Sequence, residues 1–197
     1  MIYKLYKRFI KVIKRVYFIR WLIKENDGSS LKVLDGCIDD YRNRVINRYD
    51  TKYDKLFINY SRLIAHESKC KKMKVGAVIV KDNRSISMGY NGSISGADNC
   101  CEDVMEDGSL KTRDGILHAE ENAILYSAKI GLSLDGCSIY ITHMPCIRCA
   151  RMIVSTGIKK VVYLNEYRDR SGIELLRENG LTVYKYDEDI IIDDKNS

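Results

Sequence analysis

Pro145-Cys146-Ile147-Arg148-Cys149 and, upstream of it, His118-Ala119-Glu120 are the two stretches that decide the fold and the chemistry of this chain. Zinc in a catalytic site takes three protein ligands, and thiolate and imidazole are ligands that it prefers. His118, Cys146 and Cys149 supply that number. The sequence therefore predicts a zinc site whose fourth position is open to water.

Each stretch also predicts the start of a helix. Cys146 and Cys149 are three residues apart and share one face of a helical turn. Pro145 suits the start of that helix, because a first turn leaves the N–H that proline lacks unpaired anyway. The positive end of the helix dipole favours the thiolates. A second helical pattern runs over 118–128, so we expect two helix starts to converge on one ion.

The position of Glu120, two residues after His118, favours a proton shuttle over a further metal ligand. Zinc lowers the pKa of a bound water from 15.7 towards about 7. One carboxylate can then protonate a ring nitrogen and afterwards a leaving amine. His-x-Glu with Pro-Cys-x-x-Cys is the signature of zinc nucleobase deaminases.

The alternative interpretation is a structural zinc site or a redox Cys-x-x-Cys motif. His143, three residues before Cys146, can close a structural site as its fourth ligand. Glu120 has no role in that arrangement, which favours the catalytic interpretation.

The charge of the chain is concentrated at its beginning. The 197 residues carry 33 Lys and Arg against 27 Asp and Glu, but residues 1–24 hold eight of the basic residues and no acidic one. The remainder has 25 basic against 27 acidic residues. A polynucleotide-binding enzyme normally has a basic patch on its body, so this balance favours a small substrate.

Seven cysteines are an odd count, two of them belong to the metal motif, and no secretory signal precedes them. This favours a reducing compartment over a disulfide framework. We expect a cytoplasmic location, in the host cytoplasm if the chain is viral.

Residues 1–24 follow the pattern of a basic amphipathic helix, without an apolar run long enough to cross a membrane. Three interpretations stay open: a helix packed on the body or on a neighbouring subunit, a contact with a membrane surface or nucleic acid, and an extension of little function. With a polar linker this helix forms the extension 1–53. A zinc-dependent deaminase domain over 54–187 and a tail over 188–197 are expected to follow.

The hydrophobic pattern alternates between strands and helices after a hairpin. Strands are predicted at 75–80, 85–90, 138–142, 161–164 and 182–186, and helices at 54–67, 118–128, from 146 and at 171–179, with a Gly-rich polar insertion over 91–116. This pattern predicts an α/β fold of three layers, α-β-α, with a mixed five-stranded sheet.

Five segments carry a resemblance to a known family: Ser68-Lys69-Cys70, residues 74–80, Gly89-Tyr90-Asn91-Gly92-Ser93, residues 118–123 and residues 145–150. Together they resemble the deoxycytidylate (dCMP) deaminases, of the phage type, in the zinc-dependent cytidine deaminase-like superfamily. The zinc motif alone marks the superfamily, and the Gly-Tyr-Asn-Gly loop with the long insertion narrows the resemblance to dCMP deaminases.

The resemblance implies conversion of dCMP to dUMP and ammonia, which supplies dUMP for dTMP synthesis. It implies Zn²⁺ on the three predicted ligands, Glu120 as the shuttle, Asn91 as a substrate contact and Lys74 near the substrate phosphate. From the residues alone, Asn91 as a plain turn residue and Lys74 as a solvated strand-end residue stay open. The resemblance also implies a homo-oligomer, a hexamer in many members, with dCTP and dTTP as effectors.

The chain departs from the family pattern at three places. His143-Met144 stands before Pro145-Cys146 in place of the commoner Leu-Ser type, which leaves the detail of the pocket open. Ile94 stands where the loop commonly has proline, which leaves effector regulation open. Some phage-type members hold a second, structural zinc. Cys70 and Cys100 match its cysteines, and His66 or Cys101 can complete the set; the alternative is buried free thiols.

Two competing functions stay open, one another enzyme and the other of a different class. A deaminase of tRNA or another polynucleotide, acting on adenosine or cytidine, would use the basic N-terminus as an arm. A non-catalytic zinc-binding protein would have the same fold without the catalytic activity. The neutral body argues against the first and Glu120 against the second. The motif does not separate dCMP from dCTP or deoxycytidine.

Overall fold

The computed structural model describes residues 51–187. The predicted amphipathic helix 1–24, most of the polar linker and the tail 188–197 lie outside the described residues. Helix α3, Thr51–His66, is the first described element, and it begins at Thr51 rather than at the predicted Asp54.

The centre of the fold is a five-stranded sheet in the order β2-β1-β7-β8-β9. Its strands are β1 Gly76–Lys81, β2 Arg84–Tyr90, β7 Ser138–His143, β8 Lys160–Asn165 and β9 Thr182–Lys185. β1 pairs antiparallel with both β2 and β7, whereas β7, β8 and β9 run parallel. The predicted mixed five-stranded sheet is confirmed.

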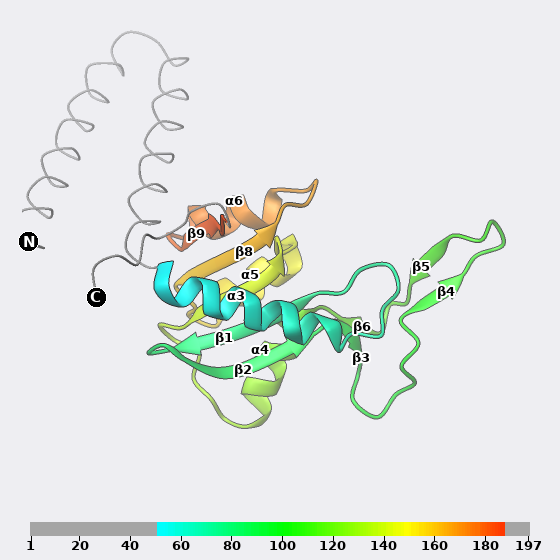
Figure 1. Cartoon of the computed structure of the whole chain (residues 1–197), viewed down its shortest axis with the longest axis horizontal. Helices are drawn as coiled ribbons and strands as arrows, with labels where there is room; N and C mark the ends of the chain where they lie inside the picture. Colours follow the sequence, from blue (N-terminus) through cyan, green and yellow to red (C-terminus); the bar gives the residue numbers. More distant parts are fainter. Residues whose placement is uncertain (1–50, 188–197) are drawn as a thin grey trace, which may run out of the picture. The chain divides into compact units, whose positions relative to one another are not determined.

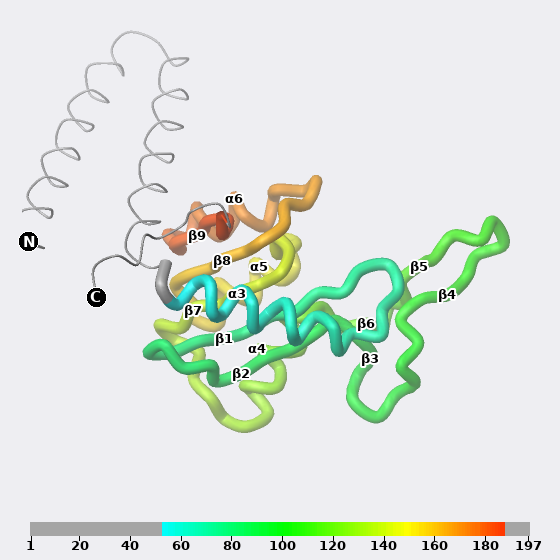
Figure 2. Tube along the Cα trace, in the orientation of Figure 1, coloured from blue at the N-terminus to red at the C-terminus, as the bar shows by residue number. Residues whose placement is uncertain are grey.

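Helices cover both faces of this sheet. Figure 1 shows α3 in front of the sheet, with α4 (Ala119–Lys129) and α5 (Ile147–Ser155) behind it. The last helix, α6 (Ser171–Glu178), packs against α5 and β9. The chain trace in Figure 2 follows the same layers. The predicted three-layer α-β-α architecture is thus confirmed.

Two glycines let the helices approach the hairpin closely. A Cβ atom at Gly76 of β1 would collide with the backbone of Ser61 and Ala65 in α3. A Cβ atom at Gly89 of β2 would lie 2.5 Å from the carbonyl oxygen of Ala119, at the start of α4. Gly89 is the register partner of Ala77, the residue after Gly76. Since successive strand residues face opposite sides, the two glycines serve opposite faces of the sheet.

The insertion between β2 and α4 is more regular than its composition predicts. Its ends pair as β3 (Gly92–Ser93) with β6 (Ile116–Leu117), directly before His118. Its middle forms a second pair, β4 (Glu102–Val104) with β5 (Leu110–Thr112), which extends beyond the end of the main sheet (Figure 1). The β3–β6 pair thus holds the two ends of the insertion together directly before His118.

Candidate active site

The two predicted helix starts meet at the predicted metal ligands. His118 is the N-cap residue of α4 and Cys146 is the N-cap residue of α5. The Nδ1 atom of His118 lies 3.5 Å from the Sγ of Cys146 and 3.4 Å from the Sγ of Cys149. Among residues 51–187, these three form the single group of three or more His, Cys, Asp or Glu side chains that can hold a metal ion.

The spacing and the chemistry of these donors fit zinc. A tetrahedral ion with Zn–N and Zn–S bonds of about 2.0 and 2.3 Å places its nitrogen and sulfur ligands about 3.5 Å apart. The distances from His118 to both sulfurs agree with that value. One imidazole and two thiolates leave the fourth tetrahedral position for a non-protein ligand. The sequence alternative with His143 as a fourth ligand is not assembled, because His143 lies outside the group.

Glu121 links the start of α4 to the start of α5, a role that the sequence did not predict. Its Oε2 accepts a hydrogen bond of 2.8 Å from the backbone N–H of His118 and one of 2.7 Å from the guanidinium of Arg148. Arg148 lies between the two cysteines of the motif. The Glu121 carboxylate is 9% exposed whereas the Arg148 side chain is 57% exposed, so only the carboxylate end of the ion pair is shielded from water. A glutamate three residues after the N-cap position is the available sequence signal.

The three predicted ligands shift one another's pKa. Hydrogen bonds from Cys149 and His118 lower the pKa of Cys146 to about 3, although burial opposes this. The hydrogen bond to Cys146, together with burial, raises the pKa of Cys149 well above the usual thiol range. The hydrogen bond to Cys146 also raises the pKa of His118. One thiolate thus forms readily, while the second thiol resists deprotonation and the imidazole binds its proton more tightly than a free imidazole does.

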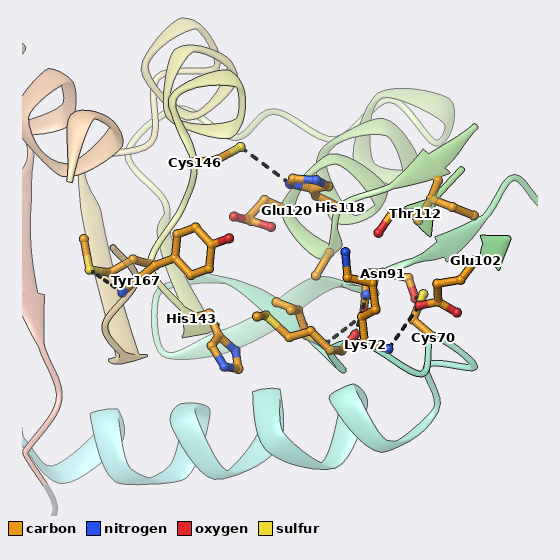
Figure 3. A pocket seen from close by; sticks show the side chains of 15 residues that line it. Cys70, Lys72, Asn91, Glu102, Thr112, His118, Glu120, His143, Cys146 and Tyr167 are labelled. Atoms are coloured by element: carbon orange, nitrogen blue, oxygen red, sulfur yellow. Dashed lines mark hydrogen bonds between the residues drawn. The ribbon is translucent and has the colours of Figure 1, made fainter. Parts of the chain in front are cut away.

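Glu120 is a buried carboxyl group at the same site. It is 3% exposed, and burial raises its pKa to about 7, with the neighbouring His118 opposing the shift. Figure 3 shows its carboxylate facing the cavity, beside His118. A carboxyl group with a pKa near neutrality can both accept and deliver a proton at physiological pH.

A cavity of about 350 Å³ opens beside these groups. Its walls come from the metal motif, the segment 70–75 before β1, the insertion and the loop after β8. A volume of this size is within the usual range for small-molecule sites. The ring of Tyr167, from the loop after β8, points into the cavity on the side where Glu120 lies (Figure 3). No sequence signal distinguished Tyr167.

Asn91 lines the cavity and fixes its wall. Its Oδ1 accepts a 2.8 Å hydrogen bond from the N–H of Val75, and its Nδ2 donates one of 2.8 Å to the carbonyl oxygen of Met73. Each end of the amide retains one further hydrogen-bonding position, a lone pair on Oδ1 and an N–H on Nδ2. Asn91 can therefore hold the wall and still contact a ligand.

Lys74, the other predicted substrate residue, lies elsewhere. It is absent from the residues that line the cavity, and its Nζ donates a 3.2 Å hydrogen bond to the backbone carbonyl oxygen of His66. Lys72 lines the cavity instead. The sequence could not show which of these two lysines lines the cavity. The segment is irregular, so no strand or helix period fixes the direction of its side chains.

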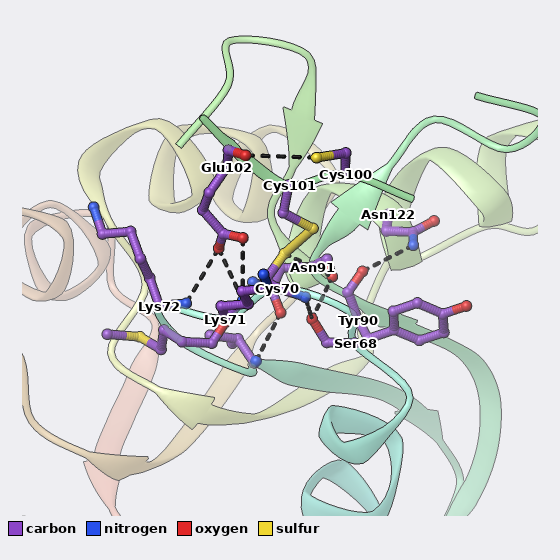
Figure 4. The surroundings of a disulfide bond; sticks show 12 residues. Ser68, Cys70, Lys71, Lys72, Tyr90, Asn91, Cys100, Cys101, Glu102 and Asn122 are labelled. Carbon is purple, nitrogen blue, oxygen red and sulfur yellow. Dashed lines mark hydrogen bonds between the residues drawn. A yellow bond between two sulfur atoms is a disulfide. The ribbon is translucent and has the colours of Figure 1, made fainter. Parts of the chain in front are cut away.

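The four residues predicted for a second zinc do not form one ligand set. Cys70 and Cys101 are joined by a disulfide, with their Cα atoms 5.1 Å apart (Figure 4). Cys100 is exposed, and its sulfur lies 3.5 Å from the carbonyl oxygen of Glu102. His66 is at the end of α3 and, within the described chain, belongs to no metal-binding group. The disulfide also departs from the expectation of reduced cysteines.

Comparison with known proteins identifies the class. Residues 51–165 match the family model of the cytidine and deoxycytidylate deaminase zinc-binding region. The chain belongs to this family, and zinc is the metal that the family binds.

Individual relatives are consistent with this result. The chain is 40% identical to ComE operon protein 2 of Bacillus subtilis over 149 residues, which cover 73% of this chain and 77% of that protein. It is 37% identical to the deoxycytidylate deaminase of Enterobacteria phage T4, over 62% of this chain and 83% of that protein. It also resembles the solved dCMP deaminase of cyanophage S-TIM5 in complex with dCMP and dUMP, with a TM-score of 0.62 and 44% identity over 67% of this chain and 95% of that chain.

Among residues 51–187, no helix combines the length and the apolar character that crossing a membrane needs.

Proposed function

We propose that the protein catalyses the hydrolytic deamination of dCMP to dUMP and ammonia, and so supplies dUMP for dTMP synthesis. The observation that carries the proposal is the buried carboxyl group of Glu120 beside the three-ligand group, at the wall of a cavity of about 350 Å³. The relatives named deoxycytidylate deaminase, and the solved relative with dCMP and dUMP, support this choice of substrate.

Zinc on His118, Cys146 and Cys149 would supply an activated water as the nucleophile at neutral pH. Glu120 would accept a proton from that water and deliver it to the ring nitrogen N3 of cytosine. The hydroxyl group would add to C4, and Glu120 would carry the proton of that hydroxyl group to the amino group, which leaves from C4 as ammonia while the C4 carbonyl group forms. The pKa of about 7 suits both transfers, because the group can change its protonation state in each step at little cost.

Asn91 would orient the substrate from the wall of the same cavity. Its two backbone hydrogen bonds fix the amide plane, so that the remaining lone pair and N–H face fixed directions. Asn91→Ala would loosen the segment 73–75 as well as remove the contact.

Assembly and regulation form a further part of the proposal. We infer a homo-oligomer, regulation by dCTP and dTTP, and a cytoplasmic location, all supported by family membership. Size-exclusion chromatography with light scattering, with and without dCTP and dTTP, tests the first two.

The test of the activity is ammonia release by zinc-loaded protein on dCMP, dCTP, deoxycytidine and a tRNA anticodon stem-loop, with and without a thiol reductant. We expect selective turnover of dCMP that follows zinc content. Turnover of the RNA alone would replace the proposal with a polynucleotide deaminase. Zinc binding without turnover of any substrate would leave a zinc-binding protein of the same fold.

A further inference from the structure

The Cys70–Cys101 disulfide joins two walls of the cavity that come from separate parts of the chain. Cys70 belongs to the segment 68–75, which contains no helix or strand and forms one wall. Cys101 directly precedes the β4–β5 hairpin, whose Glu102 and Thr112 line the cavity from the insertion. The two cysteines are 31 residues apart in the sequence, so the bond is a cross-link between the insertion and the segment before β1 (Figure 4).

The packing around this disulfide is small. The buried apolar cluster at the junction consists of Cys70, Cys101 and Ile116, and it is distinct from the main core of the sheet. The backbone N–H groups of residues 71–72 add hydrogen bonds of 3.0 and 3.2 Å to the Oε1 of Glu102. Two of the three cluster members are the bonded cysteines themselves. The covalent bond is therefore a main support of the junction, and a region with so few buried apolar contacts opens easily without it.

The position of the segment 68–75 bears directly on Asn91. The N–H of Val75 donates to the Oδ1 of Asn91, and the Nδ2 of Asn91 donates to the carbonyl oxygen of Met73, both at 2.8 Å. The Sγ of Cys70 lies 3.6 Å from the backbone carbonyl oxygen of Asn91. If the segment moves away from the insertion, Asn91 loses the partners that fix its amide at the cavity wall.

We propose that the Cys70–Cys101 disulfide is a redox switch of the cavity: the oxidised form holds the segment 68–75 in the ligand-binding position, and the reduced form binds the nucleotide more weakly. This regulation acts on the site of the proposed function and rests on it.

The switch requires a dithiol as its reductant. One thiolate of the dithiol attacks a sulfur of the disulfide, its second thiol releases the mixed disulfide, and the dithiol ends as a disulfide. Cys70 and Cys101 gain two electrons and two protons and become two thiols. Both cysteines are 2% exposed, so the reductant reaches the bond when the irregular segment opens locally.

The first experiment counts thiols in the full chain. Protein equilibrated with oxidised glutathione, then unfolded and alkylated, should have five of its seven cysteines modified. After treatment of the native protein with dithiothreitol, all seven should be modified. Seven modified cysteines before reduction, or a disulfide that persists in excess dithiothreitol, would overturn the switch.

The second experiment measures the affinity for dUMP by titration calorimetry, with zinc content determined in every sample. Reduced wild type and Cys101→Ser should bind dUMP at least about fivefold more weakly than oxidised wild type, the lower end of usual coupling between two sites. Cys101 is the cysteine to replace, because it does not line the cavity whereas Cys70 does. Cys100→Ser is the matched control: it removes the neighbouring exposed thiol, keeps the disulfide and should behave as wild type in both states.

Thermodynamic reciprocity gives a check on the same samples. If reduction weakens dUMP binding, saturating dUMP must make the disulfide harder to reduce by the same factor. The ratio of reduced to oxidised dithiothreitol at half reduction should therefore rise at least about fivefold with dUMP.

Hydrogen exchange without any nucleotide separates this inference from the proposed function. The N–H groups of residues 71–72 should exchange faster in the reduced protein, because their bonds to Glu102 depend on the closed junction. Absence of dUMP binding in both states would refute the proposed function, and faster exchange on reduction would still support the switch. Equal exchange in the two states, or equal dUMP affinity of oxidised and reduced wild type with zinc retained, would overturn it.

Discussion

At the scale of single residues, the proposed chemistry depends on Glu120. Glu120→Gln keeps the size and burial of the side chain but removes its ability to accept a proton. We expect zinc content to stay at the wild-type level, because Glu120 lies outside the metal-binding group. Turnover should fall by about 10²- to 10⁴-fold, the usual contribution of general acid–base catalysis. Metal analysis and ammonia release on the same preparation check both parts, and undiminished turnover would contradict the role.

A second prediction at this scale concerns how zinc affinity depends on the protonation of the two thiols and the imidazole. The pKa of Cys149 is raised by the hydrogen bond to Cys146 and by burial, and that of His118 is raised by the hydrogen bond to Cys146. Zinc needs deprotonated ligands, so its binding must displace these protons. Zinc affinity should therefore rise with pH, and the number of protons released should grow as the pH is lowered.

Competition with a chelator from pH 6 to 8, and calorimetry in buffers of different ionisation enthalpy, measure these quantities. Cys137→Ser, which changes a buried free thiol outside the metal group, should leave the slope unaltered. An affinity independent of pH would contradict the prediction. Zinc content measured under reducing conditions would also test the second zinc, with two ions per chain in its favour.

At the scale of elements, α6 packs closely against the start of α5. A Cβ atom at Gly172 would collide with the carbonyl oxygen of Pro145 and lie 3.0 Å from the carbonyl carbon of Cys146. Gly172→Ala should therefore displace the turn that presents the first cysteine. We expect a loss of about 1–3 kcal/mol in the free energy of unfolding, together with weaker zinc binding.

Denaturant unfolding and chelator competition check the two effects. Gly115→Ala is the control, because a Cβ atom there meets nothing within 4 Å. Wild-type stability in Gly172→Ala would show that the helix can shift without affecting the site.

At the scale of the whole deaminase unit, one buried carboxylate connects helix α3 with three strands. Asp54 of α3 is 1% exposed and accepts hydrogen bonds from Tyr140 of β7 at 2.8 Å, Lys160 of β8 at 2.9 Å and Tyr184 of β9 at 2.5 Å. The four residues come from distant parts of the chain, so their contacts form only in the complete fold.

Asp54→Ala should lower the free energy of unfolding by about 3–5 kcal/mol, because it removes one partner of a buried ion pair. Asp107→Ala, in the exposed turn between β4 and β5, should leave it nearly unchanged, because that side chain lies in solvent. Thermal and denaturant unfolding of both variants measure the difference. Equal stability of the two variants would mean that the buried network contributes no net stability.

Much of the fold follows from local patterns. The strands β1, β7 and β8 are buried on both faces, which is why they appear as continuous apolar runs in the sequence. The helix starts at His118 and Cys146 follow from N-terminal signals that act within one turn. The short strand pairs inside the insertion were not predicted. Strands of two or three residues have too few side chains to show an alternation of apolar and polar residues.

By itself, the sequence determined the candidate ligands, the candidate shuttle residue and the alternation of strands and helices, because ligand preference and hydrophobic period are properties of short segments. Only the tertiary structure decided that Cys101, not Cys100, pairs with Cys70, and that Glu121 holds Arg148. It also decided that Lys72 rather than Lys74 reaches the cavity. These outcomes depend on contacts between residues far apart in the chain, whose relative positions are fixed only when the helices pack on the sheet.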